Sequence, residues 1–120
     1  MKTLLWLDDC RNPFDTRTDW LVFSPIGRDV EVVWTQTVDE FMDFIDQHGL
    51  PDGICFDHDL GEDCYDERTG YDCAKHVVDY CLQHNCDIPA YAIQSSNPVG
   101  KDNICHIMDN YHTYYKKYHS

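Results

Sequence analysis

The sequence predicts a small three-layer α/β domain built on a parallel sheet, and three observations lead to this fold class. Short apolar runs alternate along the chain with stretches in which apolar residues recur at helical spacing. Two of these runs stop abruptly at carboxylates, which is typical of strands that end at a ligand-binding edge. A length of 120 residues with a hydrophobic fraction of 42% suits one domain with its own core. We therefore treat residues 1–120 as a single domain.

The first half of the chain predicts two strands and a helix. The strand Leu4–Leu7 ends at Asp8 and Asp9, and a second strand, rich in β-branched residues, is expected at Val30–Trp34. Between them, residues 10–28 are interrupted by proline and glycine, and their apolar run at 20–23 is compatible with either a short helix or a strand. A helix follows the polar turn Thr35-Gln36-Thr37, which offers an N-cap; its apolar residues recur at 38, 41, 42 and 45, and it ends at Gly49 and Pro51.

The second half predicts two more strands and two more helices. A strand at 53–56 runs into Asp57, and a polar loop follows at 61–69. Apolar residues at helical spacing over 71–82 indicate a helix that stops near Asn85, and Ala90–Ile93 indicates another strand. The last helix carries a stripe that we assign to core packing, formed by Ile104, Ile107, Met108, Tyr111 and Tyr115. This order favours parallel strands joined by crossover helices.

Net charge, apolar runs and cysteine content exclude some classes of partner and function. A formal net charge of −13 argues against a surface that grips long nucleic acid by its backbone, but it is compatible with a small phosphorylated ligand, most simply a nucleotide. No apolar run approaches a membrane span, and the chain enters its first strand directly, so we expect no membrane partner and a cytoplasmic location. The seven cysteines lack a CxxC pair and are expected to be reduced thiols, with a zinc site at Cys81, His84 and Cys86 as a minor alternative. The sequence leaves the oligomeric state open.

Carboxylates at two strand ends predict a cation site. In a parallel sheet the carboxyl ends of neighbouring strands share one edge, so these acidic residues are expected to approach one another. Such a group repels itself unless a proton or a hard divalent cation occupies its centre. We therefore expect Mg²⁺ or Mn²⁺ there, with four candidate ligands: Asp8, Asp9, Asp57 and Asp59.

Phosphate chemistry is what such a site would support. Phosphoryl transfer needs neutralised oxygens, a placed nucleophile and a proton for the leaving oxygen. The candidate catalytic residues are Asp57, Asp9 and His58, the last a general acid between two carboxylates. The candidate substrate-binding residues are Arg11, Ser95, Ser96, Asn97 and Lys101. Each also has a structural alternative: a core-facing His58, an Arg11 that pairs with an acid, or an ordinary turn at 95–98.

The pattern resembles the receiver domain of response regulators, and more closely a divergent receiver-like group predicted to process cyclic phosphates. The second resemblance rests on four motifs in order: Leu7-Asp8-Asp9-Cys10-Arg11-Asn12-Pro13, Phe56-Asp57-His58-Asp59-Leu60-Gly61, Thr69-Gly70-Tyr71-Asp72 and Ser95-Ser96-Asn97-Pro98-Val99-Gly100. It implies a flavodoxin-like parallel sheet that lacks the receiver's fifth strand and final helix. In receivers the acid pair and the central aspartate hold magnesium, and that aspartate accepts a phosphoryl group.

The resemblance and the site chemistry together predict a metal-dependent phosphodiesterase-like hydrolase acting on a cyclic nucleotide or a 2′,3′-cyclic phosphate end. Alternatives are a non-catalytic module that captures a nucleotide signal or a partner protein, and a receiver phosphorylated on Asp57. The missing fifth strand, and Lys101 on a helix rather than a strand, count against the receiver. The DxD at 57–59 also resembles haloacid-dehalogenase-type phosphatases, which need more chain after it. An interaction protein acting through its acidic surface is a further alternative.

Overall fold

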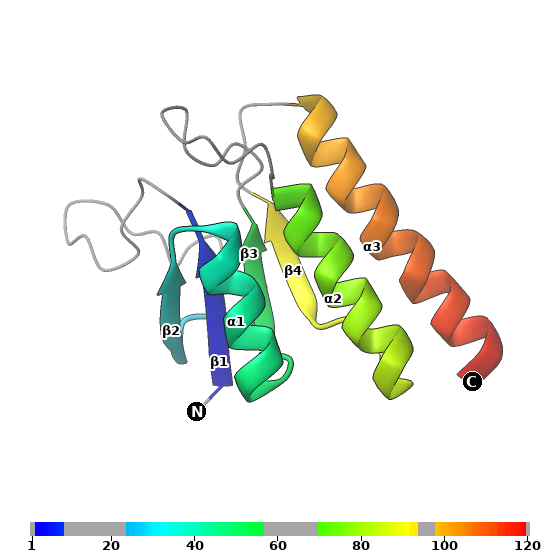
Figure 1. The fold of residues 1–120 in the computed structure, drawn as a ribbon, viewed down its shortest axis with the longest axis horizontal. Helices are drawn as coiled ribbons and strands as arrows, with labels where there is room; N and C mark the ends of the chain where they lie inside the picture. The colour runs from blue at the N-terminus through cyan, green and yellow to red at the C-terminus, as the bar shows by residue number, and fades with distance from the viewer. Residues whose placement is uncertain (1, 9–23, 57–69, 94–97, 120) are drawn as a thin grey trace.

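The computed structural model describes residues 2–8, 24–56, 70–93 and 98–119, which form a four-stranded parallel sheet with three helices (Figure 1). The sheet has the order β2-β1-β3-β4. The predicted α/β class is confirmed: the fold is receiver-like, and the described residues contain no fifth strand. The elements are β1 (Lys2–Leu7), β2 (Val30–Thr35), α1 (Val38–His48), β3 (Gly53–Phe56), α2 (Gly70–His84), β4 (Ala90–Ile93) and α3 (Pro98–His119).

The central strands β1 and β3 are buried on both faces of the sheet. Leu5 and Leu7 point to the face that carries the helices, whereas Leu4 and Trp6 point to the opposite face, and all four are at most 1% exposed. Side chains alternate along a strand, so a strand covered on both faces reads as a continuous apolar run. This explains why the sequence 4–7 shows no polar alternation.

The main hydrophobic core lies between the sheet and the helices. Helices α1, α2 and α3 all contribute buried side chains to it. The rings of Phe41 on α1 and Phe56 on β3 have centroids 5.8 Å apart, and α3 adds Ile104 and Met108. Helix α1 begins with a capping box, in which the Thr37 hydroxyl accepts the Glu40 N–H while the Glu40 carboxylate accepts the Thr37 N–H. The N-cap expected within the polar turn 35–37 is therefore present, at Thr37, and the apolar stripe of α3 packs in the core as expected.

A smaller cluster occupies the opposite face of the sheet. It contains Leu4, Trp6 and Cys55, with Ile26 packed against it. Gly53 makes this approach possible, because a Cβ there would lie 2.9 Å from Ile26 Cδ1. The stretch for which the sequence predicts no definite element falls mostly at 9–23, outside the described residues.

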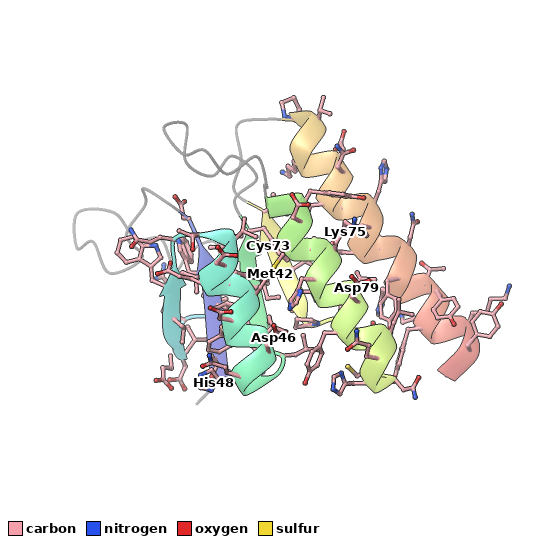
Figure 2. The ribbon with its side chains drawn as sticks, in the orientation of Figure 1. Met42, Asp46, His48, Cys73, Lys75 and Asp79 are labelled. Carbon is pink, nitrogen blue, oxygen red and sulfur yellow. The ribbon has the colours of Figure 1, made fainter. Side chains whose placement is uncertain are left out.

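The helices carry polar outer faces. Asp46, Lys75 and Asp79 are exposed on α1 and α2 (Figure 2), and Asp46 Oδ1 lies 2.8 Å from His76 Nε2, which links the two helices. The exposed face of α1 is acidic, with carboxylates at Asp39, Asp43 and Asp46. None of the described helices is both long and apolar enough to cross a membrane.

Candidate cation and phosphate site

The strand order places a crevice at the carboxyl ends of β1 and β3. Strand β2 lies on one side of β1 and β3 on the other, so the chain reverses its direction of progress between β1 and β3. Trp6 pairs with Cys55, which brings the ends of the two strands to the same edge of the sheet. Ligands of open α/β sheets bind at such a switch point. The Asp8-Asp9 pair follows β1 in the chain and Asp57 follows β3.

Asp8 is the member of the predicted acidic set that the structure describes. Its backbone N–H and its backbone carbonyl both form hydrogen bonds. It is 2% exposed. Its N–H donates to the Thr35 carbonyl at 3.1 Å, and its own carbonyl accepts the Trp34 Nε1–H at 2.8 Å. Two residues earlier on β1, the Trp6 carbonyl accepts the Thr35 hydroxyl at 3.0 Å. The end of β1 is thus fixed by side chains and backbone of β2.

The N-termini of the helices lie at the edge of the sheet where the strands have their carboxyl ends. Each described helix follows a strand, so the N-termini of α1, α2 and α3 all lie at the carboxyl edge of the sheet (Figure 1). The helix dipole makes this edge favourable for anions. The first turns of α1 and α2 contain acidic residues, whereas the first turn of α3 contains none and carries Lys101, which is exposed.

Most of the predicted site residues cannot be placed. Asp8 lies at the end of β1 and Lys101 lies in the first turn of α3. The remaining candidates fall outside the described residues: Asp9, Arg11, Asp57, His58, Asp59, Ser95, Ser96 and Asn97. Within the described ranges, no group of three or more His, Cys, Asp and Glu side chains is arranged to hold a metal ion.

The close spacing of Cys81, His84 and Cys86, which suggested a zinc site, has a structural explanation. Asn85 has a φ of 52°, and the Cys86 N–H donates to the Cys81 carbonyl at 3.1 Å, which is the pattern of a helix ended by a left-handed residue. This turn brings the two cysteines together, and burial raises the pKa of the Cys81 thiol. His84 Nδ1 lies 2.9 Å from the Tyr80 carbonyl, and its ring stacks on the Tyr80 ring. The three residues therefore close a helix.

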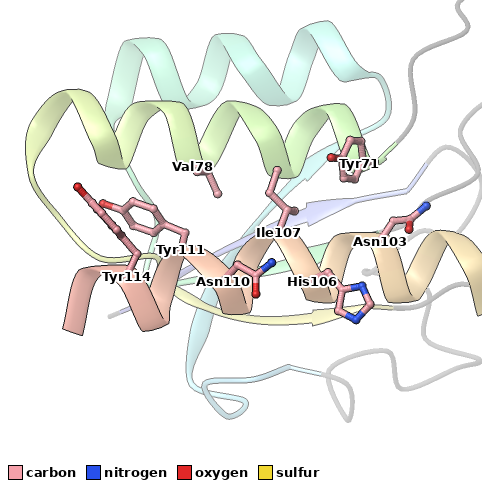
Figure 3. A pocket seen from close by; sticks show the side chains of 8 residues that line it. All are labelled: Tyr71, Val78, Asn103, His106, Ile107, Asn110, Tyr111 and Tyr114. Atoms are coloured by element: carbon pink, nitrogen blue, oxygen red, sulfur yellow. The ribbon is translucent and has the colours of Figure 1, made fainter. Parts of the chain in front are cut away.

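An open groove of about 720 Å³ runs between α2 and α3 (Figure 3). Its near end lies at Tyr71, the second residue of α2, and it extends to Tyr114 on α3. The α3 wall presents two amides and an imidazole to solvent, those of Asn103, Asn110 and His106. Tyrosine rings and the apolar side chains of Val78 and Ile107 complete the lining.

Trp34 and Thr35 are not among the residues that the sequence motifs predict for the site. Trp34 ends the predicted second strand, and Thr35 falls in the polar turn predicted after it. Their contacts with β1 depend on the register that pairs Trp6 with Trp34 and Leu7 with Thr35. The sequence feature that could have indicated them is a pair of side-chain donors, an indole and a hydroxyl, at the end of the strand next to β1.

Comparison with known proteins supports the fold and identifies the family. The sequence profile described as the cyclic-phosphate processing receiver domain matches residues 3–110. A solved chain described as a yeast Spc42 trimeric coiled coil fused to another structure has a similar fold, with a TM-score of 0.59 and 19% identity over 88% of this chain. Our chain covers 63% of that one. A search of curated proteins finds no match. Because the profile spans most of its length, the chain belongs to the cyclic-phosphate processing receiver domain family.

Proposed function

We propose that the chain is a metal-dependent phosphodiesterase-like domain that binds and hydrolyses a cyclic phosphate, either a cyclic nucleotide or a 2′,3′-cyclic phosphate end. The observation that carries this proposal is the position of Asp8. It is a buried carboxylate at the switch point of the sheet, in a chain whose family is named for cyclic-phosphate processing. A buried charge is costly unless another charge or hydrogen bonds compensate it, so a carboxylate at this place suits a cationic ligand.

The donor chemistry fits a hard divalent cation. The proposed ligands are carboxylates only, and Mg²⁺ and Mn²⁺ prefer such oxygens. Asp8 is held at the end of β1, while Asp9, Asp57 and Asp59 are assigned from their place in the sequence motifs. When bound, the cation supplies charge neutralisation to the non-bridging oxygens of the phosphate.

The protein's own residues divide the remaining work. Arg11, Ser95, Ser96 and Asn97 are proposed to bind phosphate oxygens, with Lys101 adding positive charge at the start of α3. Asp57 and Asp9 are proposed to place a water molecule at phosphorus and to accept its proton as the new phosphorus–oxygen bond forms. As one phosphorus–oxygen bond of the ring breaks, His58 donates a proton to the leaving oxygen.

The α2–α3 groove is where we propose that a nucleoside part of the substrate lies. Tyr71 is the second residue of α2 and Asn103 is the sixth residue of α3, so one end of the groove lies near the helix N-termini at the edge proposed for phosphate. Aromatic rings stack on bases, and amides donate to and accept from their edges. A base-free cyclic phosphate should then bind more weakly than a cyclic nucleotide.

The test is turnover of 2′,3′- and 3′,5′-cyclic nucleotides with Mg²⁺ or Mn²⁺, followed by ³¹P NMR. We expect a ring-opened monophosphate from the parent chain and none from Asp57→Asn, which should remain folded by circular dichroism. Asp52→Asn, the same chemical change at the opposite edge of the sheet, should keep parental activity. Binding without product at any metal concentration would support a non-catalytic binding module. Neither binding nor product would contradict the proposal.

A further inference from the structure

The end of the β1–β2 ladder contains an unusual exchange of hydrogen-bond donors. The Asp8 N–H continues the parallel ladder by donating to the Thr35 carbonyl at 3.1 Å. One more bond of the same ladder would have the Thr37 N–H donate to the Asp8 carbonyl, given the pairing of Leu7 with Thr35. That donor is engaged elsewhere. Glu40 Oε2 accepts the N–H groups of Gln36 and Thr37, at 2.7 and 3.2 Å, to complete the capping box of α1.

The indole of Trp34 takes the place of the missing ladder donor. Its Nε1–H donates to the Asp8 carbonyl at 2.8 Å, in a partly buried position. This carbonyl is bonded to the Cα atom that carries the Asp8 side chain, and it lies in a planar peptide group, so a bond to it restrains the backbone of Asp8. Asp8 itself is 2% exposed, which leaves little solvent to compete for that bond.

We propose that Trp34 is a positioning residue for the cation site: its indole bond to the Asp8 carbonyl fixes the backbone that carries the Asp8 carboxylate, so that this carboxylate is held in place for a divalent cation. The proposal rests on the function proposed above. Residues that orient metal ligands contribute to affinity without touching the metal, and their loss weakens binding. The capping box of α1 is part of the same arrangement, because it withdraws the Thr37 N–H and leaves the Asp8 carbonyl to the indole.

The experiment compares Mn²⁺ binding by the parent, Trp34→Phe and Thr35→Val, with the electron paramagnetic resonance signal of free Mn²⁺ as the readout. Trp34→Phe keeps a ring in the small cluster but removes the donor to Asp8. Thr35→Val is the matched control, because it removes a side-chain donor at the same strand end that serves Trp6 instead. We expect Trp34→Phe to raise the dissociation constant about tenfold. Thr35→Val should stay within about twofold of the parent, in line with the small effect of a bond that does not reach the acid pair.

Two results would overturn the inference, and they are distinguishable from failure of the proposed function. Equal affinity of the parent and Trp34→Phe would show that the indole bond does not set the site. Equal losses in Trp34→Phe and Thr35→Val would indicate general loosening of the strand end. If the parent does not bind Mn²⁺ and behaves like Asp8→Asn, the cation site itself fails, and the role of Trp34 fails with it. Thermal melting of each variant checks that it is folded.

Discussion

Each end of the central strand β1 lies beside an aspartate, and the two aspartates are held in opposite ways. At the amino end, Asp52 is exposed and its carboxylate accepts the Thr3 N–H at 2.8 Å, while its own N–H donates to the Thr3 carbonyl at 3.0 Å. At the carboxyl end, Asp8 is buried, and Trp34 and Thr35 make the bonds to its backbone. Asp52 uses its carboxylate to fasten the main chain. Asp8 has its main chain held by Trp34 and Thr35, which is the support that the proposed cation ligand would need.

The largest expected effect is on the free energy of unfolding, at a core residue that should leave cation affinity unchanged. Ile54 lies on β3 opposite Leu5 and is fully buried in the main core. Ile54→Ala should lower the free energy of unfolding by about 2–5 kcal/mol, because it leaves a cavity between sheet and helices. Urea unfolding measures this. At temperatures where the variant is folded, its cation affinity should equal that of the parent, since neither end of β1 is altered. A large change in affinity would show that the site cannot be separated from the core.

Alkaline pH should weaken the face of the sheet that carries Trp6. Burial raises the pKa of Cys55 from 9.0 to about 12. An unfolded chain ionises this thiol at lower pH than the folded chain, so stability is intact below pH 9.0 and falls as pH rises toward about 12. The slope from this group is at most about 1.4 kcal/mol per pH unit. Cys55→Ala should show a shallower loss of stability over this interval in urea unfolding, and an unchanged slope would contradict the assignment.

A substitution beside the amino end of β1 should lower the free energy of unfolding only modestly. Asp52→Ala removes the carboxylate that accepts the Thr3 N–H, and we expect a loss of about 1 kcal/mol in the free energy of unfolding. Cation affinity should not change, because Asp52 lies at the opposite edge of the sheet from Asp8. A metal-binding defect in this variant would erase the distinction between the two aspartates.

The smallest expected effect is at Lys101. It is exposed in the first turn of α3, where an added charge interacts weakly with a bound anion. Lys101→Ala should raise KM for a cyclic nucleotide by about 2- to 5-fold, with kcat unchanged. Lys75→Ala on the exposed face of α2 is a suitable control, since it removes the same charge from a site within the helix. Equal effects in both variants would point to a general charge effect.

The fold was largely predictable from local patterns. Apolar runs and helical spacing indicated every described strand and helix, because buried strands and amphipathic helices bear those patterns directly. The start of α3 was less clear. Its apolar stripe begins at Ile104, but the helix begins at Pro98, whose fixed φ suits the first helical position and whose neighbour Val99 is exposed.

The candidate site was only partly predictable. A carboxylate at the end of an apolar run indicated Asp8, because that pattern is local. The bond from Trp34 to Asp8 joins residues 26 positions apart, and it depends on strand register and on the capping box that engages Thr37. Neither condition appears as a motif. The grouping of Cys81, His84 and Cys86 shows the reverse, since close spacing suggested a ligand set where the structure has a helix terminus.

The most direct test of the account is a titration with Mg²⁺ and Mn²⁺ followed by thermal melting of the parent, Asp8→Asn and Asp52→Asn. We expect the melting temperature of the parent and of Asp52→Asn to rise with metal concentration, because the cation binds the folded chain. Asp8→Asn should show no rise, although it melts cooperatively. If all three proteins respond alike, or if metal changes none of them, the buried aspartate at the end of β1 is not a cation ligand and the central claim is wrong.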